Sequence, residues 1–110
     1  MNRFLLKELL INEGVSPFGD WFDGLDTTAA VKVTVALTRL EQGNLSRVRW
    51  FRGLGEVRID WGAGLRIYFA RDGDDILLLL GGGTKHRQQQ DIDLSLARLA
   101  HYRKLKQSRS

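Results

Sequence analysis

Cationic and phenolic side chains recur in the second half of the chain at positions that suit the binding of phosphate. Arg58 and Arg66 stand on either side of a glycine-containing turn, Tyr68 follows two residues later, and Lys85 comes after a run of three glycines. A guanidinium offers a planar fork of donors that matches phosphate oxygens, and an ammonium supplies a compact positive charge. These four residues are therefore candidates for contacting a phosphate-bearing ligand. The alternative for each cation is an ion pair or a solvated surface position.

A second group of basic residues lies in the segment Leu45–Gly53, where Arg49 and Arg52 flank Trp50 and Phe51. Arginines interleaved with aromatic residues can grip single-stranded nucleic acid through charge and base stacking. The same pattern is typical of an edge strand whose arginine stems lie on apolar surface. The sequence leaves both interpretations open.

The candidate arginines must be positioned by two strands within residues 54–71. Apolar and polar residues alternate on both sides of a turn at Gly62 and Gly64, and side chains on a strand change face at every residue. We expect one face of this hairpin to be apolar and the other to be open, with Arg58, Arg66 and Tyr68 on the open face. The apolar face would carry Val57, Ile59, Trp61, Leu65, Ile67 and Phe69.

The chain before this hairpin predicts a strand and two helices. Phe4–Ile11 is ambiguous, because its leucines could line a helix, but the turn signal at Asn12-Glu13-Gly14 favours a strand that leads into a turn. Ser16 is expected to cap a short helix with Pro17 at its first position, ended by Gly24. Asp26 is expected to cap a second helix, Thr27–Gln42, and a short connection between the helices predicts a helical hairpin.

The chain after the hairpin predicts one more strand and a final helix. Asp72-Gly73-Asp74 indicates a turn, and Ile76–Leu80 lacks polar alternation, so it should be a central strand buried on both faces and ended by the three glycines. Thr84 is a predicted N-cap for a helix that runs to about Lys104. The order of elements predicts an α+β fold with a small, mostly antiparallel sheet.

Size and composition limit the class of protein. The 110 residues suit one domain, 1–110, and the absence of cysteine excludes disulfides and thiol chemistry. Residues 44–71 hold six arginines and only two acidic residues, so a polyanion such as nucleic acid is a natural partner, although a basic solvated surface would look the same. The N-terminal segment, broken by Lys7 and Glu8, is too short for a signal peptide, and no run is long enough to span a membrane. We expect a soluble cytoplasmic protein.

Four pieces of the sequence, in order, resemble the RelE/HigB-type toxins of bacterial type II toxin–antitoxin modules, in the phage-related addiction module killer protein branch. The resemblance covers about residues 8–105. The matching pieces are EGVSPFGDWFDGL (Glu13–Leu25), LTRLEQGN at the end of the second predicted helix, GEVRIDWGAGLRIYFARDG (Gly55–Gly73) and ILLLLGGGTKHRQQQDI (Ile76–Ile92).

This resemblance implies a RelE-like fold and a ribosome-dependent endoribonuclease (an mRNA interferase) that needs no metal or other cofactor. In that chemistry the ribose 2′-hydroxyl attacks the adjacent phosphate and leaves a cyclic phosphate and a free 5′-hydroxyl. Arg58, Arg66, Tyr68 and Lys85 match the family's catalytic positions, and Arg49, a weaker match, would contact RNA. The implied partners are mRNA on the ribosome and a cognate antitoxin, a small helix-turn-helix protein.

The sequence departs from the family pattern at three positions. Leu65 stands where the family usually has a tyrosine, Thr84 where it has an aspartate, and His86 where it has a small hydroxyl residue. His86 is either an added acid or base that contacts RNA or a solvated residue at a helix start. Fold alone does not fix activity, so the competing functions are a non-catalytic RNA-binding module and a protein that mainly receives an antitoxin.

Overall fold

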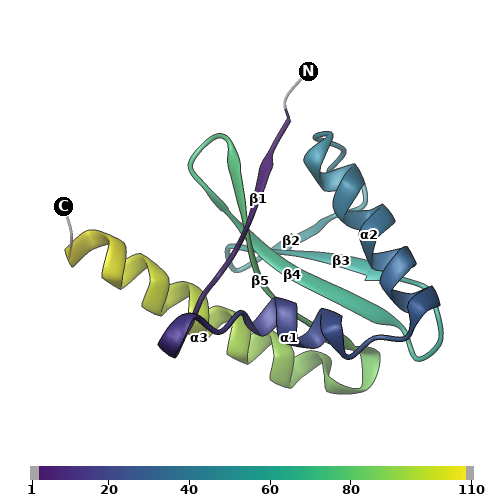
Figure 1. Ribbon diagram of the computed structural model, residues 1–110. Helices are drawn as coiled ribbons and strands as arrows, with labels where there is room; N and C mark the ends of the chain where they lie inside the picture. The colour runs from purple at the N-terminus through teal and green to yellow at the C-terminus, as the bar shows by residue number, and fades with distance from the viewer. Residues whose placement is uncertain (1–2, 109–110) are drawn as a thin grey trace.

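The protein has an α+β architecture in which helices cover both faces of one sheet (Figure 1). The computed structural model describes residues 3–108. Within them a five-stranded sheet has the order β1-β5-β4-β3-β2, with β1 parallel to β5 and the other pairs antiparallel. The strands are β1 (Leu5–Glu8), β2 (Arg49–Phe51), β3 (Leu54–Ile59), β4 (Leu65–Asp72) and β5 (Ile76–Thr84). The helices are α1 (Pro17–Asp23), α2 (Thr27–Glu41) and α3 (Gln88–Ser108), with short 3-10 turns η1 (Asn12–Gly14) and η2 (Lys85–Arg87).

The starts of the first two helices follow from their capping residues, as the sequence predicted. The Ser16 hydroxyl accepts a hydrogen bond from the Gly19 amide at 2.9 Å, and the Asp26 carboxylate accepts one from the Ala29 amide at 2.8 Å. Each cap satisfies an amide that has no partner inside the helix. The N-terminal strand is also confirmed, and α2 ends at Glu41, one residue before the predicted end.

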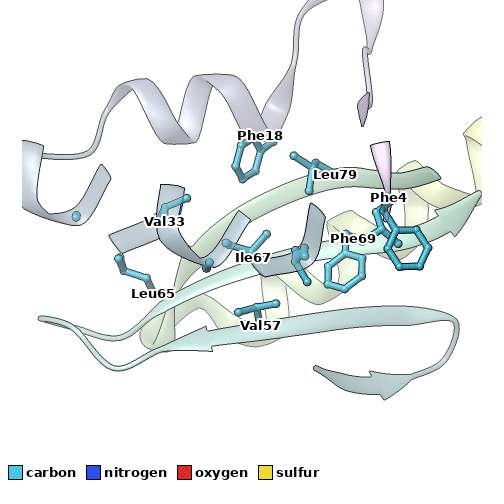
Figure 2. Packing of buried hydrophobic residues seen from close by; sticks show 12 residues of the cluster. Phe4, Phe18, Val33, Val57, Leu65, Ile67, Phe69 and Leu79 are labelled. Atoms are coloured by element: carbon cyan, nitrogen blue, oxygen red, sulfur yellow. The ribbon is translucent and has the colours of Figure 1, made fainter. Parts of the chain in front are cut away.

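One face of the sheet carries the larger core, beneath α1 and α2. Figure 2 shows Phe18 and Val33 of these helices above the strands, next to the alternate side chains of β4. The expected helical hairpin is found only in part, because α1 packs against β5 while α2 packs against β3. This cluster includes Phe4, Phe18, Val33, Val57, Leu65, Ile67, Phe69 and Leu79.

The other face of the sheet is covered by α3, so the expectation of an open face is wrong. Tyr68 is fully buried and Arg66 is only 7% exposed. The apolar stripe of a long helix has to bury itself against another element, and this face is the one that α1 and α2 leave uncovered. The second core joins Leu54, Tyr68, Ala70, Leu78, Leu80, Ile92 and Leu99.

The three glycines do not end the last strand but lie within it, because β5 runs to Thr84. A methyl group on Gly82 would overlap the Trp21 ring of α1, and one on Gly83 would overlap the Asp91 carboxylate of α3. Gly81 leaves room for the Arg98 guanidinium, which donates to the Leu80 carbonyl at 3.0 Å. Glycine is therefore needed here because helices approach the strand closely from both sides.

Two further boundaries differ from the sequence predictions. Thr84 makes no capping hydrogen bond, since η2 intervenes before α3, and α3 continues past Lys104 to Ser108. Strand β3 ends at Ile59, so Trp61 lies outside it, 39% exposed, with the Lys32 ammonium 4.9 Å from its ring centre. Among residues 3–108, no helix is both long and apolar enough to cross a bilayer.

Candidate functional site

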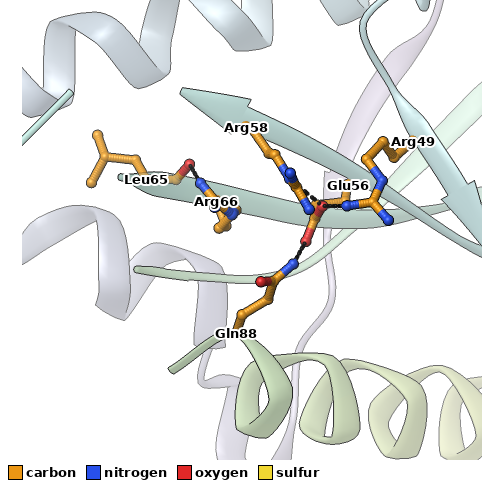
Figure 3. A network of polar contacts seen from close by, with 6 residues as sticks. All are labelled: Arg49, Glu56, Arg58, Leu65, Arg66 and Gln88. Carbon is orange, nitrogen blue, oxygen red and sulfur yellow. Dashed lines mark hydrogen bonds and ion pairs between the residues drawn. The ribbon is translucent and has the colours of Figure 1, made fainter. Parts of the chain in front are cut away.

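Strand pairing brings the two candidate arginines together. Arg58 of β3 lies directly opposite Arg66 of β4 in the antiparallel register, so both side chains point to the same face (Figure 3). The turn that joins these strands is tied to η2, because the Lys85 amide donates to the Gly64 carbonyl at 3.0 Å. Segments about twenty residues apart in the sequence thus meet at one end of the sheet.

Gly64 is required at this junction. Its φ of +83° is a backbone conformation that favours glycine. A methyl group there would lie 3.3 Å from both the Arg66 Nη1 atom and the Lys85 Cβ atom. The residue therefore permits the turn and leaves room beside it for the Arg66 guanidinium and the base of the Lys85 side chain.

These residues line an open pocket of about 520 Å³ at the end of the hairpin. Three of the four predicted catalytic residues, Arg58, Arg66 and Lys85, contribute to its wall, and so does His86. The remaining lining consists of Asp60, Gly62, Ala63 and Gly64. Two guanidinium groups and one amine line this pocket together with one carboxyl group, so its chemistry favours an anionic ligand.

Among the residues that line the pocket, Arg66 has the surroundings that point most directly to an anionic ligand. Its side chain is largely buried, yet no carboxylate of the described residues lies within ion-pair distance. Its Nη1 atom donates to the Leu65 carbonyl at 3.3 Å, and its buried Nε atom has no partner in residues 3–108. A buried guanidinium without a counter-ion is costly, and active sites are where such groups are found.

Arg58 is held in place by a buried acid that the sequence analysis did not single out. Glu56 is fully buried, and its carboxylate accepts hydrogen bonds from Arg58 Nε at 3.0 Å and from Gln88 Nε2 at 2.9 Å (Figure 3). Arg49 Nη1 lies 3.5 Å from the same carboxylate. The Arg58 side chain remains 45% exposed, so the terminal nitrogens of its guanidinium can face a ligand. The spacing of two between Glu56 and Arg58 on a strand was the available signal.

Tyr68 does not line the pocket and is fully buried, contrary to the expectation that it lies on an open face beside Arg58 and Arg66. It lies opposite Glu56 on the face covered by α3, and its hydroxyl makes no hydrogen bond with the described residues. Burial raises the pKa of Tyr68 well above the usual value for a phenol, and the nearby carboxylate of Glu56 raises it further. In this conformation it can act on a ligand only through its neighbours.

The predicted RNA-contacting residues are spread over the surface. Arg49 is exposed on the edge strand β2, which confirms the edge-strand interpretation of that segment, and Arg52 is exposed in the β2–β3 turn. Only His86, exposed on η2, reaches the pocket. Asp60 lines the pocket as well and was not predicted. Among residues 3–108, no group of three or more His, Asp or Glu side chains comes together in a way that could hold a metal ion.

Comparison of the sequence with known proteins found a relative but no description of its role. No family model matches it, and no solved structure matches it significantly. A protein of Haemophilus influenzae, described as an uncharacterized protein, is 34% identical over 77 residues, which span 68% of this chain and 78% of the relative.

Proposed function

The chain belongs to the family of this Haemophilus influenzae protein, and from the chemistry of its pocket we propose that it is the toxin of a bacterial type II toxin–antitoxin module. On this proposal it has a RelE-like fold and acts as a ribosome-dependent endoribonuclease of the RelE/HigB type. Its substrate would be mRNA on the translating ribosome, so it would act in the cytoplasm. Its regulator would be a cognate antitoxin, a small helix-turn-helix protein.

The observation that carries the proposal is the buried guanidinium of Arg66, which has no carboxylate partner among residues 3–108, in the wall of a pocket shared with Arg58 and Lys85. A structural arginine of this burial would be expected to have a carboxylate partner. A phosphodiester would supply the missing negative charge, and the two guanidinium groups side by side match its non-bridging oxygens. The α+β fold and the order of the sheet are compatible with this assignment.

In the proposed reaction the ribose 2′-oxygen forms a bond to the adjacent phosphorus, and the bond from phosphorus to the 5′-oxygen breaks. The proton of the 2′-hydroxyl passes to a base, and the leaving 5′-oxygen takes up a proton. The products are a 2′,3′-cyclic phosphate and a free 5′-hydroxyl. Arg58 and Arg66 would stabilise the negative charge that builds up on the phosphoryl oxygens as the attack proceeds.

Proton transfer would fall to the exposed residues at the pocket rim. An imidazole can accept and donate protons near neutral pH, and His86 lines the pocket. Lys85 would neutralise the negative charge that develops on the phosphate, and Asp60 contributes a carboxylate to the wall of the same pocket. Tyr68 is excluded from direct proton transfer in this conformation because its hydroxyl is sealed beneath α3. Glu56 would act as a positioning residue for Arg58.

The test is induced expression in growing bacteria with mapping of new mRNA 5′ ends. The parent chain should arrest growth and produce cuts within translated regions, whereas Arg66→Met and Lys85→Ala should do neither. Arg103→Met, at an exposed position on α3 away from the pocket, is the matched control and should behave like the parent. If both pocket variants arrest growth as well as the parent does, the site assignment is wrong.

A non-catalytic RNA-binding module is the second candidate, and the burial of Tyr68 favours it. The family resemblance expects this tyrosine at the reaction centre, yet it cannot touch a ligand in the pocket. On this alternative the purified chain would bind RNA through Arg58 and Arg66 but leave ribosome-bound mRNA intact. If the amount of full-length mRNA on ribosomes is the same with and without the protein, the RNA-binding module is supported over the nuclease.

A further inference from the structure

The two halves of α3 contact the sheet in different ways, and the C-terminal half is anchored by hydrogen bonds. Arg98 Nη1 donates to the Leu80 carbonyl of β5 at 3.0 Å. The Tyr102 hydroxyl donates to the carboxylate of Asp72, the last residue of β4, at 2.6 Å, and Lys106 Nζ reaches the same carboxylate at 2.6 Å. Bonds with a charged partner are among the stronger ones in a protein, so this half of the helix is firmly docked.

The N-terminal half of α3 instead buries polar groups that have no partner. Ser95 is 1% exposed, and its Oγ atom has no hydrogen-bond partner in residues 3–108. The Oδ2 atom of Asp91, one turn earlier, is buried and equally without a partner in that part of the chain. Burial raises the pKa of the Asp91 carboxyl, although Arg87 and Arg98 nearby act in the opposite direction. Docking of this half therefore desolvates two polar groups that gain no hydrogen bond from the sheet.

The strands beneath these two side chains add a third polar group without a partner. A methyl group on Gly83 would overlap the Asp91 carboxylate, and one on Gly81 would lie 3.9 Å from the hydroxyl oxygen of Ser95. Gly81 pairs with Tyr68, whose buried hydroxyl has no hydrogen bond with any described residue. Buried polar groups are nearly always hydrogen-bonded, so three exceptions at one contact identify the weakly held part of the helix.

The start of α3 is connected to the pocket at the end of the hairpin through one buried acid. Thr84 does not cap the helix, and Gln88 Nε2 donates to the Glu56 carboxylate at 2.9 Å (Figure 3). The other oxygen of that carboxylate accepts from Arg58 Nε at 3.0 Å. Arg58 lines the pocket, so the first residue of α3 and a guanidinium of the site share the same partner. Movement of the helix start is thereby transmitted to Arg58.

We propose that residues 88–95 form a latch that controls the orientation of Arg58, with Gln88 as the positioning residue. While the latch is docked, Gln88 holds the Glu56 carboxylate in the geometry that presents Arg58 to the pocket. When the latch undocks, water replaces Gln88 at Glu56, and the pocket binds phosphate more weakly. Bound phosphate therefore favours the docked state, because a ligand stabilises the state that binds it better. The latch rests on the proposed function only in that Arg58 and Arg66 bind phosphate, and it requires no cleavage of RNA.

Amide hydrogen exchange of the full chain, followed by NMR, measures undocking of the latch. Amides 92–95 donate within the helix, so their exchange reports the opening of its first turns. Without phosphate they should exchange faster than amides 99–106, whose half of the helix is anchored. Inorganic phosphate at about ten times its Kd should slow exchange at 92–95 about fivefold or more, which corresponds to about tenfold weaker binding in the open state. Potassium chloride at equal ionic strength controls for screening.

Gln88→Met removes the connection between the helix and Glu56. At about ten times its own Kd, phosphate should still stabilise this variant against global unfolding in urea, but exchange at 92–95 should slow less than about twofold. A purely structural role of Gln88 would change the stability of the fold and leave this coupling intact. Gln90→Met is the matched control, because Gln90 is exposed on the same turn and accepts from Arg87 Nε at 3.1 Å, and its variant should keep the coupling of the parent.

Ser95→Ala tests why the latch is weakly docked. The substitution removes a buried hydroxyl without a partner, so exchange at 92–95 should slow about fivefold or more in the absence of phosphate. The gain in helix propensity from serine to alanine accounts for about twofold of this change. Slowing of twofold or less would therefore show that the hydroxyl does not weaken docking.

Three results would overturn the latch: exchange that is equally fast in both halves of α3, slowing by phosphate that is the same in Gln88→Met as in the parent, or Ser95→Ala that exchanges like the parent. Phosphate that stabilises the fold in urea but does not slow exchange at 92–95 would also refute it. Phosphate that does neither refutes the phosphate site together with the latch. A chain that shows the coupling but cuts no mRNA refutes only the proposed nuclease, and one that cuts mRNA without the coupling refutes only the latch.

Discussion

Replacing Arg66 with methionine should stabilise the protein while it abolishes the proposed activity. Methionine keeps most of the aliphatic stem that packs against the sheet but removes the guanidinium. That guanidinium is buried, has no carboxylate partner among residues 3–108, and leaves its Nε atom without a hydrogen bond. A group held in this way is expected to serve a ligand at the expense of fold stability.

The magnitude follows from the contacts of Arg66. An unpaired buried donor costs roughly 1–3 kcal/mol, and more when the group is charged. The substitution gives up one long hydrogen bond, from Nη1 to the Leu65 carbonyl at 3.3 Å, which contributes about 0.5–1.5 kcal/mol. The net expectation is a gain of about 1 kcal/mol in the free energy of unfolding. For a chain of 110 residues this corresponds to an increase in Tm of about 4 °C.

Urea and thermal unfolding with and without inorganic phosphate measure the stability of Arg66→Met and the stabilisation that bound phosphate gives each protein. Phosphate at about ten times its Kd should stabilise the parent by about 1.4 kcal/mol, since it binds the folded state alone, and should leave Arg66→Met unaffected. Potassium chloride at equal ionic strength controls for screening. The reasoning is refuted if Arg66→Met unfolds more easily by about 1 kcal/mol or more and is still stabilised by phosphate, because Arg66 would then be a structural residue.

Three further substitutions test other contacts. Tyr68→Phe should raise the free energy of unfolding by about 1 kcal/mol, because it removes a buried hydroxyl without a partner, and should leave mRNA cleavage within about twofold of the parent; a clear loss of cleavage would show that the tyrosine reaches the substrate. Gly82→Ala should destabilise the fold by about 2 kcal/mol or more in urea melts, since the added methyl group overlaps the Trp21 ring; a neutral result would mean that α1 yields easily. The hydrogen bond from Lys106 lowers the pKa of Asp72, so the stabilisation is present above the unfolded pKa of about 4 and is lost as the pH falls through the lower folded value. Asp72→Asn should therefore lose less stability than the parent below about pH 4, and parallel pH profiles would contradict this cause.

Local signals predicted much of the fold because they act within a few residues. The caps at Ser16 and Asp26 determine where α1 and α2 begin, and the alternation along β4 determines which side chains share a face. The register of β4 with β5 shifts between Tyr68 and Phe69, because β5 has one extra residue, Leu80, at that point. No local pattern in the sequence indicates this shift as clearly as the caps and the alternation indicate the helices and strands. The three glycines were misplaced because their cause is tertiary: Trp21 belongs to a helix distant in sequence, and Asp91 belongs to the following helix, which folds back over the strand.

The site was predicted only in part, because strand pairing follows from local sequence whereas the packing of a helix on the sheet does not. Pairing across one hairpin was enough to bring Arg58 and Arg66 together, and the turn at Gly64 adds Lys85. What the hairpin could not show is that α3 closes over the same face, which seals Tyr68 and reduces the exposure of Arg66. The amphipathic stripe of α3 was visible in the sequence, but its destination was not, because a helix can bury its stripe on any uncovered face.

The most direct test of the central claim is a single-turnover cleavage assay on ribosomes programmed with an mRNA that carries one 2′-deoxynucleotide at the cut site. The parent chain should cut the all-ribose message to leave a cyclic phosphate and a 5′-hydroxyl. The 2′-deoxy message should stay intact at that position, and Arg66→Met should cut neither message. Cleavage of the 2′-deoxy message, or undiminished cleavage by Arg66→Met, would contradict the proposed mechanism.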